Sequence, residues 1–127
     1  MNNKLLLDTS VIIDFLRQKE KTDTVLYILS RENSELYISV ITHTELYAGK
    51  SVWELDNARA ELETLFGGLR IKPLTETISK SAGQLKARCK MDLIDAIIAT
   101  TALQSGMPLV TLKTKHFEQV EDLELYH

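Results

Sequence analysis

Hydrophobic residues alternate along the chain between short continuous runs and longer stretches with helical spacing. The short runs predict strands over residues 5–8, 36–40, 69–71, 109–111 and 123–126. Apolar positions three and four residues apart predict helices over residues 10–16, 22–31, 42–49, 52–66, 75–88 and 92–103. Because strands and helices alternate, we expect one α/β domain over residues 1–127, with helices on both faces of a short central parallel sheet.

A carboxylate interrupts the first apolar run. Asp8 directly follows Leu5, Leu6 and Leu7, and apolar residues resume at Val11. An unpaired charge among buried aliphatic side chains costs several kcal/mol, so Asp8 must lie at an edge, be paired or hold a cation. It could also serve as the N-cap of the next helix. Ligands gather at the carboxyl ends of parallel strands, and Asp8 occupies such an end.

Three more carboxylates are candidates for the same site. Glu45 shares a helix face with Ala48 and Gly49, which leave room for a cation, although a salt bridge to a nearby Lys or Arg would also explain it. Asp92 and Asp95 lie three residues apart and share a helix face, but an N-cap and a first-turn acid would explain both. Clustered carboxylates repel one another unless a cation neutralises them, and oxygen ligands suit Mg²⁺ or Mn²⁺ better than zinc.

Composition limits the possible classes. Hydrophobic residues make up 44% and charged residues 26% of the chain, as in ordinary globular proteins. Cys89 is the only cysteine, so no intramolecular disulfide can form. No signal-peptide pattern or apolar run of membrane-spanning length occurs, so we expect a cytoplasmic protein. The net charge of −3 argues against coating nucleic acid by overall attraction, and only local basic groups could bind it.

Two other families with acidic pockets are disfavoured by spacing. A haloacid-dehalogenase-type phosphatase needs a second Asp two residues after the first, where this chain has Ser10. A receiver domain needs a phosphoacceptor Asp on the middle strand, and the segment LYISVIT has none. No P-loop glycine pattern is present.

Four segments in this order resemble PIN-domain ribonucleases, specifically VapC-type toxins of bacterial or archaeal toxin–antitoxin pairs: LLLDTSVIIDFL, SVITHTELYAG, DAIIATTAL and PLVTLKTKHF. The resemblance implies an α/β/α PIN-like fold and an endoribonuclease that depends on Mg²⁺ or Mn²⁺. It also implies RNA as substrate, a small antitoxin as partner and a homodimer. A catalytically weak module that binds metal and RNA is the alternative, and a signalling domain phosphorylated on Asp8 is a third hypothesis.

The resemblance also assigns roles to residues. Asp8, Glu45 and Asp95 match the metal-binding and catalytic acids of the family. Thr9 and Thr111 match hydroxyls that orient water or phosphate.

Other positions depart from the family pattern or extend it. Asp92 does not fall on a usual family position and is at best auxiliary. Lys113 stands where relatives often carry Asp or Asn, so it is expected near the phosphate in place of a second ion. His116 is expected to be structural. We further expect the helical hairpin over residues 42–66 to expose Trp53 as an interface anchor, although packing into its own domain would also explain a large aromatic residue there. Three basic residues are expected to guide RNA: Lys86, Arg88 and Lys115.

Overall fold

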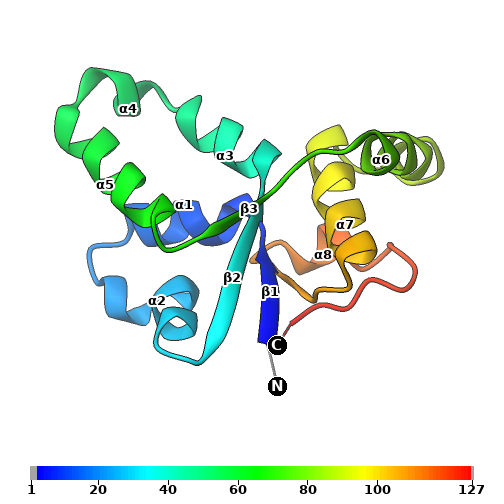
Figure 1. Ribbon diagram of the computed structural model, residues 1–127, viewed down its shortest axis with the longest axis horizontal. Coiled ribbons are helices and arrows are strands. Elements are labelled where there is room, and N and C mark those ends of the chain that lie inside the picture. The colour runs from blue at the N-terminus through cyan, green and yellow to red at the C-terminus, as the bar shows by residue number, and fades with distance from the viewer. Residues whose placement is uncertain (1–2, 127) are drawn as a thin grey trace.

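The computed structural model describes residues 3–126, which contain a parallel four-stranded sheet (Figure 1). The strands are β1 (Asn3–Leu7), β2 (Ser34–Ser39), β3 (Arg70–Lys72) and β4 (Leu109–Val110). Their order is β3-β2-β1-β4, so the chain moves outward from β1 and then returns to its other side. The strand order therefore reverses between β1 and β4, and ligands of open α/β sheets bind in the crevice at such a point.

Helices cover both faces of the sheet, which confirms the predicted α/β/α arrangement. The helices are α1 (Thr9–Arg17), η1 (Lys21–Asp23), α2 (Val25–Ser30), α3 (Val40–Tyr47), α4 (Lys50–Glu54), α5 (Asp56–Phe66), α6 (Glu76–Arg88), α7 (Leu93–Ser105) and α8 (Thr114–Phe117). Helices α1 to α5 pack on one side, and α6 to α8 pack on the other (Figure 1). None of the helices between residues 3 and 126 has the length and apolar character that crossing a membrane requires.

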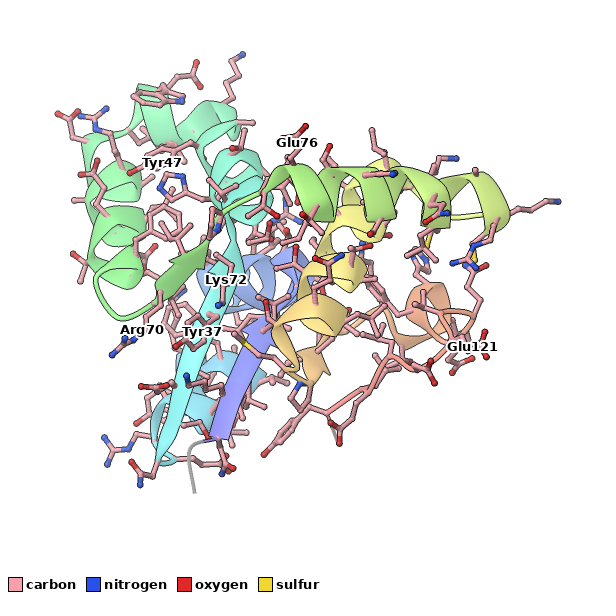
Figure 2. All side chains as sticks on the ribbon, turned by 45° about the vertical axis from the view of Figure 1, so that its right-hand side comes forward. Tyr37, Tyr47, Arg70, Lys72, Glu76 and Glu121 are labelled. Carbon is pink, nitrogen blue, oxygen red and sulfur yellow. The ribbon has the colours of Figure 1, made fainter. Side chains whose placement is uncertain are left out.

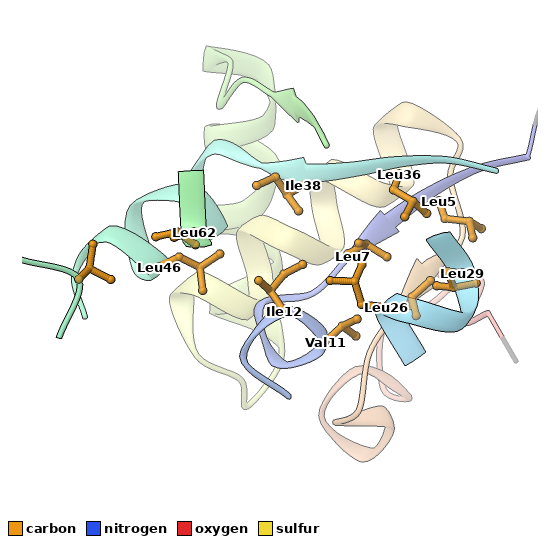
Figure 3. Close-up of a cluster of buried hydrophobic side chains, with 12 residues drawn as sticks. Leu5, Leu7, Val11, Ile12, Leu26, Leu29, Leu36, Ile38, Leu46 and Leu62 are labelled. Atoms are coloured by element: carbon orange, nitrogen blue, oxygen red, sulfur yellow. The ribbon is translucent and has the colours of Figure 1, made fainter. Parts of the chain in front are cut away.

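The two cores follow from the alternation of side chains along the strands. Leu5 and Leu7 join a cluster with buried residues of α1 and α2, which Figure 3 shows beneath the sheet. Leu6 points the other way and joins a second cluster with α7 and α8. All three leucines are at most 2% exposed, so β1 is buried on both faces, as its continuous apolar run predicts.

Several predicted boundaries are wrong, and local hydrogen bonds explain two of them. Helix α3 begins two residues before the predicted start, because the Ser39 side chain caps it by accepting from the Ile41 N–H. Thr24 caps α2 in the same way, which divides the predicted helix over 22–31 into η1 and α2. The helix predicted over 52–66 is two helices, because Leu55 is extended. The predicted strand over 123–126 is a single bridge between Leu109 and Leu125.

Helix α7 carries the central acid of the site and is the most deeply packed helix of the second layer. Eight of its residues are buried, including Asp95. It ends at Gly106, whose φ of 66° lies in the left-handed region that favours glycine. The helix thus extends two residues beyond its predicted end at residue 103, and the turn at Gly106 fixes the short return of the chain into β4.

Candidate active site

The site lies where β1 and β4 end side by side. The Asp8 backbone N–H donates to the Val110 carbonyl at 2.8 Å, which holds the two strand ends together. The Asp8 side chain is fully buried, and its Oδ2 accepts from the hydroxyls of Ser10 and Thr111, both at 2.7 Å. Two hydroxyls from residues 101 positions apart therefore share one carboxylate oxygen. This confirms that Asp8 lies at the carboxyl edge of the sheet.

Asp8 does not cap a helix with its side chain, although it occupies the N-cap position of α1. Its second oxygen, Oδ1, is buried and has no hydrogen-bond partner among the described residues. Buried polar atoms nearly always have partners, and an unsatisfied one costs about 1–3 kcal/mol. Helix capping thus fails to explain Asp8, whose second oxygen lacks the partner that a buried carboxylate oxygen normally has.

Glu45 is held in place by a hydroxyl pair. Thr9 donates to Glu45 Oε1 at 2.5 Å, and the Thr9 hydroxyl also lies 2.9 Å from that of Thr42. Thr9 and Thr42 are buried, whereas Glu45 is half-buried. Among residues 3–126, Glu45 makes no ion pair within 4 Å, so the alternative of a salt bridge to Lys or Arg is not supported.

Asp95 is the buried acid on α7, and two basic side chains meet it. Lys113 Nζ donates to Asp95 Oδ1 at 3.1 Å, and His116 Nδ1 lies 3.6 Å from Oδ2. The Asp95 side chain is only 5% exposed. The His116 side chain is 57% exposed and lies beside the acid rather than in the core, and its structural role stays a prediction.

The Lys113 ammonium is close enough to all three predicted acids to feel their charge. Burial alone would lower the pKa of Lys113. Attraction to Asp8, the hydrogen bond that the ammonium donates to Asp95, and the charges of Asp95 and Glu45 outweigh burial, so the pKa is raised above its usual value. Of the three acids, only Asp95 contacts the ammonium directly, and the charges of Asp8 and Glu45 act on it from farther away.

Two adjoining pockets open beside Asp95. The first has a volume of about 480 Å³ and is lined by Thr9, Ser10, Glu45, Asp92, Leu93, Ile94, Asp95 and Lys113. The second, of about 270 Å³, is lined by Lys90, Met91, Asp92, Asp95, Lys115, His116 and Gln119. Asp92 and Asp95 line both pockets, so the two pockets meet at these acids. Three basic side chains line the second pocket: Lys90, Lys115 and His116.

The remaining predicted residues differ in how they lie relative to the two pockets. Asp92 is exposed at the N-cap position of α7 without a capping hydrogen bond, so its side chain is free to face the pockets. Lys115 lines the second pocket, whereas Lys86 and Arg88 are exposed near the end of α6 and line neither.

Sequence reasoning missed other members of the site. The hydroxyls of Ser10 and Thr42 tie the acids to neighbouring segments, and Lys90 lines the second pocket. Ser10 stands two residues after Asp8, so its proximity to the acid was the only signal available.

The described residues do not form a ready-made metal cage. Between residues 3 and 126, no three acidic, histidine or cysteine side chains group closely enough to hold an ion as they stand. Glu45 and Asp95 have protein partners instead, Thr9 and Lys113. Lys113 nonetheless pairs with Asp95 and lines the same pocket as Glu45.

Comparisons with known proteins extend over nearly the whole chain. The family model of the PIN domain matches residues 5–123. Ribonuclease VapC19 of Mycobacterium tuberculosis is 31% identical over 124 residues, which cover 94% of this chain and 96% of that protein. Two solved structures have a similar fold. VapBC2 from Rickettsia felis bound to a promoter DNA fragment has a TM-score of 0.81, with 20% identity over 97% of both chains. A toxin–antitoxin complex from Klebsiella pneumoniae has a TM-score of 0.76, with 24% identity over 94% of both.

Proposed function

Because the chain belongs to the PIN-domain family, and within it to the VapC group, we propose that it is a Mg²⁺- or Mn²⁺-dependent endoribonuclease that serves as the toxin of a type II toxin–antitoxin pair. The relative from M. tuberculosis is named a ribonuclease, which supports RNA as the substrate class. A similar fold occurs in a toxin–antitoxin complex, which supports a small antitoxin as partner. A homodimer and a cytoplasmic location belong to the same proposal.

The observation that carries this proposal is the state of the Asp8 carboxylate. It is completely buried, two hydroxyls fix one oxygen, and the other oxygen has no partner among the described residues. A cation would satisfy that oxygen and relieve the repulsion between Asp8 and the other acids. Asp8, Glu45 and Asp95 offer only oxygen ligands, which fit Mg²⁺ or Mn²⁺. These three residues would hold the ion.

The chain's own residues prepare the acids for hydrolysis. A bound Mg²⁺ or Mn²⁺ would acidify a water molecule and supply positive charge opposite the phosphate. Ser10 and Thr111 fix the orientation of Asp8, and Thr9 fixes that of Glu45, so little reorganisation is needed when substrate binds. Asp95 or Asp8 receives the proton that the attacking water loses.

Basic residues allow an acidic centre to accept RNA. Lys113 has a side chain that is 36% exposed, and its ammonium contacts a phosphate oxygen where a second ion would otherwise lie. Lys90, Lys115 and His116 line the adjoining pocket and bind the backbone on that side of the scissile phosphate. Lys86 and Arg88 extend this attraction outward from the end of α6.

An RNA cleavage assay with matched variants tests the proposal. Asp8→Asn, Glu45→Gln and Asp95→Asn should each reduce Mn²⁺-dependent cleavage by at least about 100-fold, since even outer-sphere changes around metal ligands typically cost 10–100-fold. Asp92→Asn is the control, because Asp92 lies at the start of the same helix as Asp95 but is exposed. It should retain activity within about tenfold. Cleavage that persists in EDTA, or in all three variants, would contradict the proposal.

A second candidate function is favoured by the contact between Lys113 and Asp95. If the ammonium permanently occupied the position of the cation, the domain would bind RNA without cutting it. The two functions differ in turnover. Single-turnover and multiple-turnover assays on the same RNA, with Mn²⁺ present, separate a slow nuclease from a binding module.

A further inference from the structure

The ion pair between Lys113 and Asp95 differs from the others in the molecule. In the five ion pairs of residues 3–126 that do not involve Asp95, both side chains are at least 31% exposed. Asp95 is only 5% exposed, and the Lys113 ammonium bonds its Oδ1 at 3.1 Å. Exposed pairs contribute little to stability, whereas a charge that has lost its water depends strongly on its partner. Asp95 therefore needs a cation beside it at all times.

We propose that Lys113 is a displaceable internal counter-ion, which competes with the divalent cation for Asp95 and so sets the metal affinity of the site. The inference rests on the proposed function, because it assumes that the acids bind metal. It goes further by assigning the resting protein a low metal affinity and by naming the residue responsible.

The main chain around Lys113 is fixed, while its side chain is free to move. Its backbone N–H donates to the Thr111 hydroxyl at 2.9 Å, and that hydroxyl in turn donates to Asp8. The Lys113 side chain is 36% exposed and carries its charge on a flexible four-carbon chain. Exchange of the ammonium for a metal ion at Asp95 Oδ1 therefore requires only side-chain rotation.

His116 is the other basic group at Asp95, and it is less suited to this role. Its Nδ1 lies 3.6 Å from Oδ2, beyond hydrogen-bond distance, and the ring is 57% exposed. It faces the second pocket, whereas Lys113 lines the first pocket together with Glu45. Of the two, only Lys113 lines the same pocket as both Glu45 and Asp95.

The exchange of the ammonium for a metal ion would couple metal binding to substrate binding. Once displaced, the ammonium needs another anion, and a phosphate oxygen of RNA is the one that the proposed reaction provides. Binding of phosphate would then favour binding of metal, and by linkage the metal would favour phosphate equally. Without RNA, the ammonium would keep Asp95 paired and the acids partly neutralised.

Calorimetric titration with Mn²⁺ measures the competition directly. Lys113→Met keeps most of the side-chain length but removes the charge, and it should tighten Mn²⁺ binding at least tenfold, because a hydrogen bond to a charged group is typically worth about one decade or more in affinity. Lys115→Met is the matched control, since it removes the same charge two residues away, where the structure has no contact with Asp95. It should change the affinity by no more than about twofold. Lys113→Gln, which keeps a donor without the charge, should also tighten binding.

Thermal unfolding provides a second readout that is independent of catalysis. In EDTA, Lys113→Met should melt several degrees below the wild type, because Asp95 loses its counter-ion. In saturating Mn²⁺ this difference should close or reverse, because the metal replaces the ammonium. A merely structural lysine would lower the melting temperature equally in both conditions, and that result would overturn the inference.

The possible failures can be told apart. If Mn²⁺ binds the wild type and both Lys113 variants with equal affinity, the inference is wrong while the proposed metal site survives. If Mn²⁺ binds none of these proteins, both the inference and the metal dependence in the proposed function are wrong.

Discussion

Two regions of this molecule depart from the usual distribution, in which charged side chains are exposed and large apolar side chains are buried. At the ends of β1 and β4, Asp8 is 0% exposed although it carries a charge. At the tip of the segment formed by α3, α4 and α5, which we call the helical arm, Trp53 is 61% exposed although it is large and apolar. Buried charge and exposed aromatic surface are both informative, because neither follows from folding alone. The first region is suited to a small cation and the second to a protein.

The two regions also differ in what holds them together. Hydroxyl groups fix two acids of the site, with Ser10 and Thr111 around Asp8 and Thr9 at Glu45. Ring contacts build the arm, where Tyr47 packs against Phe66 at 5.4 Å and Trp53 at 5.8 Å between centroids. Figure 2 shows Tyr47 among the helices of the arm, away from the strands. The acidic site and the exposed aromatic surface should therefore respond to mutation independently.

Trp53 is exposed but held in place. Its indole N–H donates to the Tyr47 carbonyl at 2.6 Å, and the Arg59 guanidinium lies 5.9 Å from its ring. A side chain that is already ordered loses little entropy when a partner covers it, which is typical of an interface anchor. The expected exposure of Trp53 is confirmed, and its role in association with the antitoxin or a second copy of the chain stays a prediction.

Among substitutions that should affect one region and not the other, the largest effect is expected at Trp53. Trp53→Ala should weaken antitoxin binding or self-association by about 2 kcal/mol or more, roughly 30-fold, while Mn²⁺-dependent cleavage by the isolated domain is unchanged. Light scattering measures self-association, and titration with the antitoxin measures the complex. Leu55→Ala, at a neighbouring site that is 53% exposed, is the matched control for general loss of apolar surface. If association with both partners is unaltered, the exposed aromatic surface is not the docking surface.

A smaller effect, a gain in stability, is expected when Asp8 is replaced. Without metal, Asp8→Asn should raise the melting temperature by about 4 °C, because roughly 1 kcal/mol of repulsion among the acids is removed. The same variant should lose cleavage, so stability and activity change in opposite directions. Thermal unfolding in EDTA measures the change in melting temperature. A variant that melts below the wild type would mean that the bonds of Asp8 with Ser10 and Thr111 matter more than its charge.

The contrast between the regions also explains how far the sequence could be interpreted. Asp8 could be found because it interrupts an apolar run, and the exposure of Trp53 followed from its place on a helical hairpin. The resemblance placed Thr111 in the site, but its bond to Asp8 could not be predicted, since Thr111 lies 103 residues away and a hydroxyl bond leaves no periodic signal. The position of His116 beside Asp95 could not be predicted for the same reason.

The element boundaries were hard to predict for a similar reason, because single contacts between residues close in sequence determine them. The sheet and its covering helices follow from apolar periodicity, which many residues share, so single errors do not change the layers. The start of α3 depends on one cap hydrogen bond, which the Ile41 N–H donates to the Ser39 side chain, and the break before α5 depends on the extended backbone of Leu55. Such single contacts have no repeated pattern along the chain. They decide where an element begins, and sequence patterns rarely predict that position.

The central claim is that a divalent cation binds among Asp8, Glu45 and Asp95, and paramagnetic broadening by Mn²⁺ tests it most directly. In amide spectra of the isotope-labelled protein, substoichiometric Mn²⁺ should first broaden signals from residues 8–10, 44–46, 94–96 and 111–113. Signals from the helical arm around Trp53 and from the start of α6 at Thr75 should remain sharp at the same ratio. The Asp8→Asn variant should require markedly more Mn²⁺ for the same broadening. Broadening spread over exposed acids such as Glu54, Asp56 and Glu76, with the signals around Asp8 still sharp, would contradict the account.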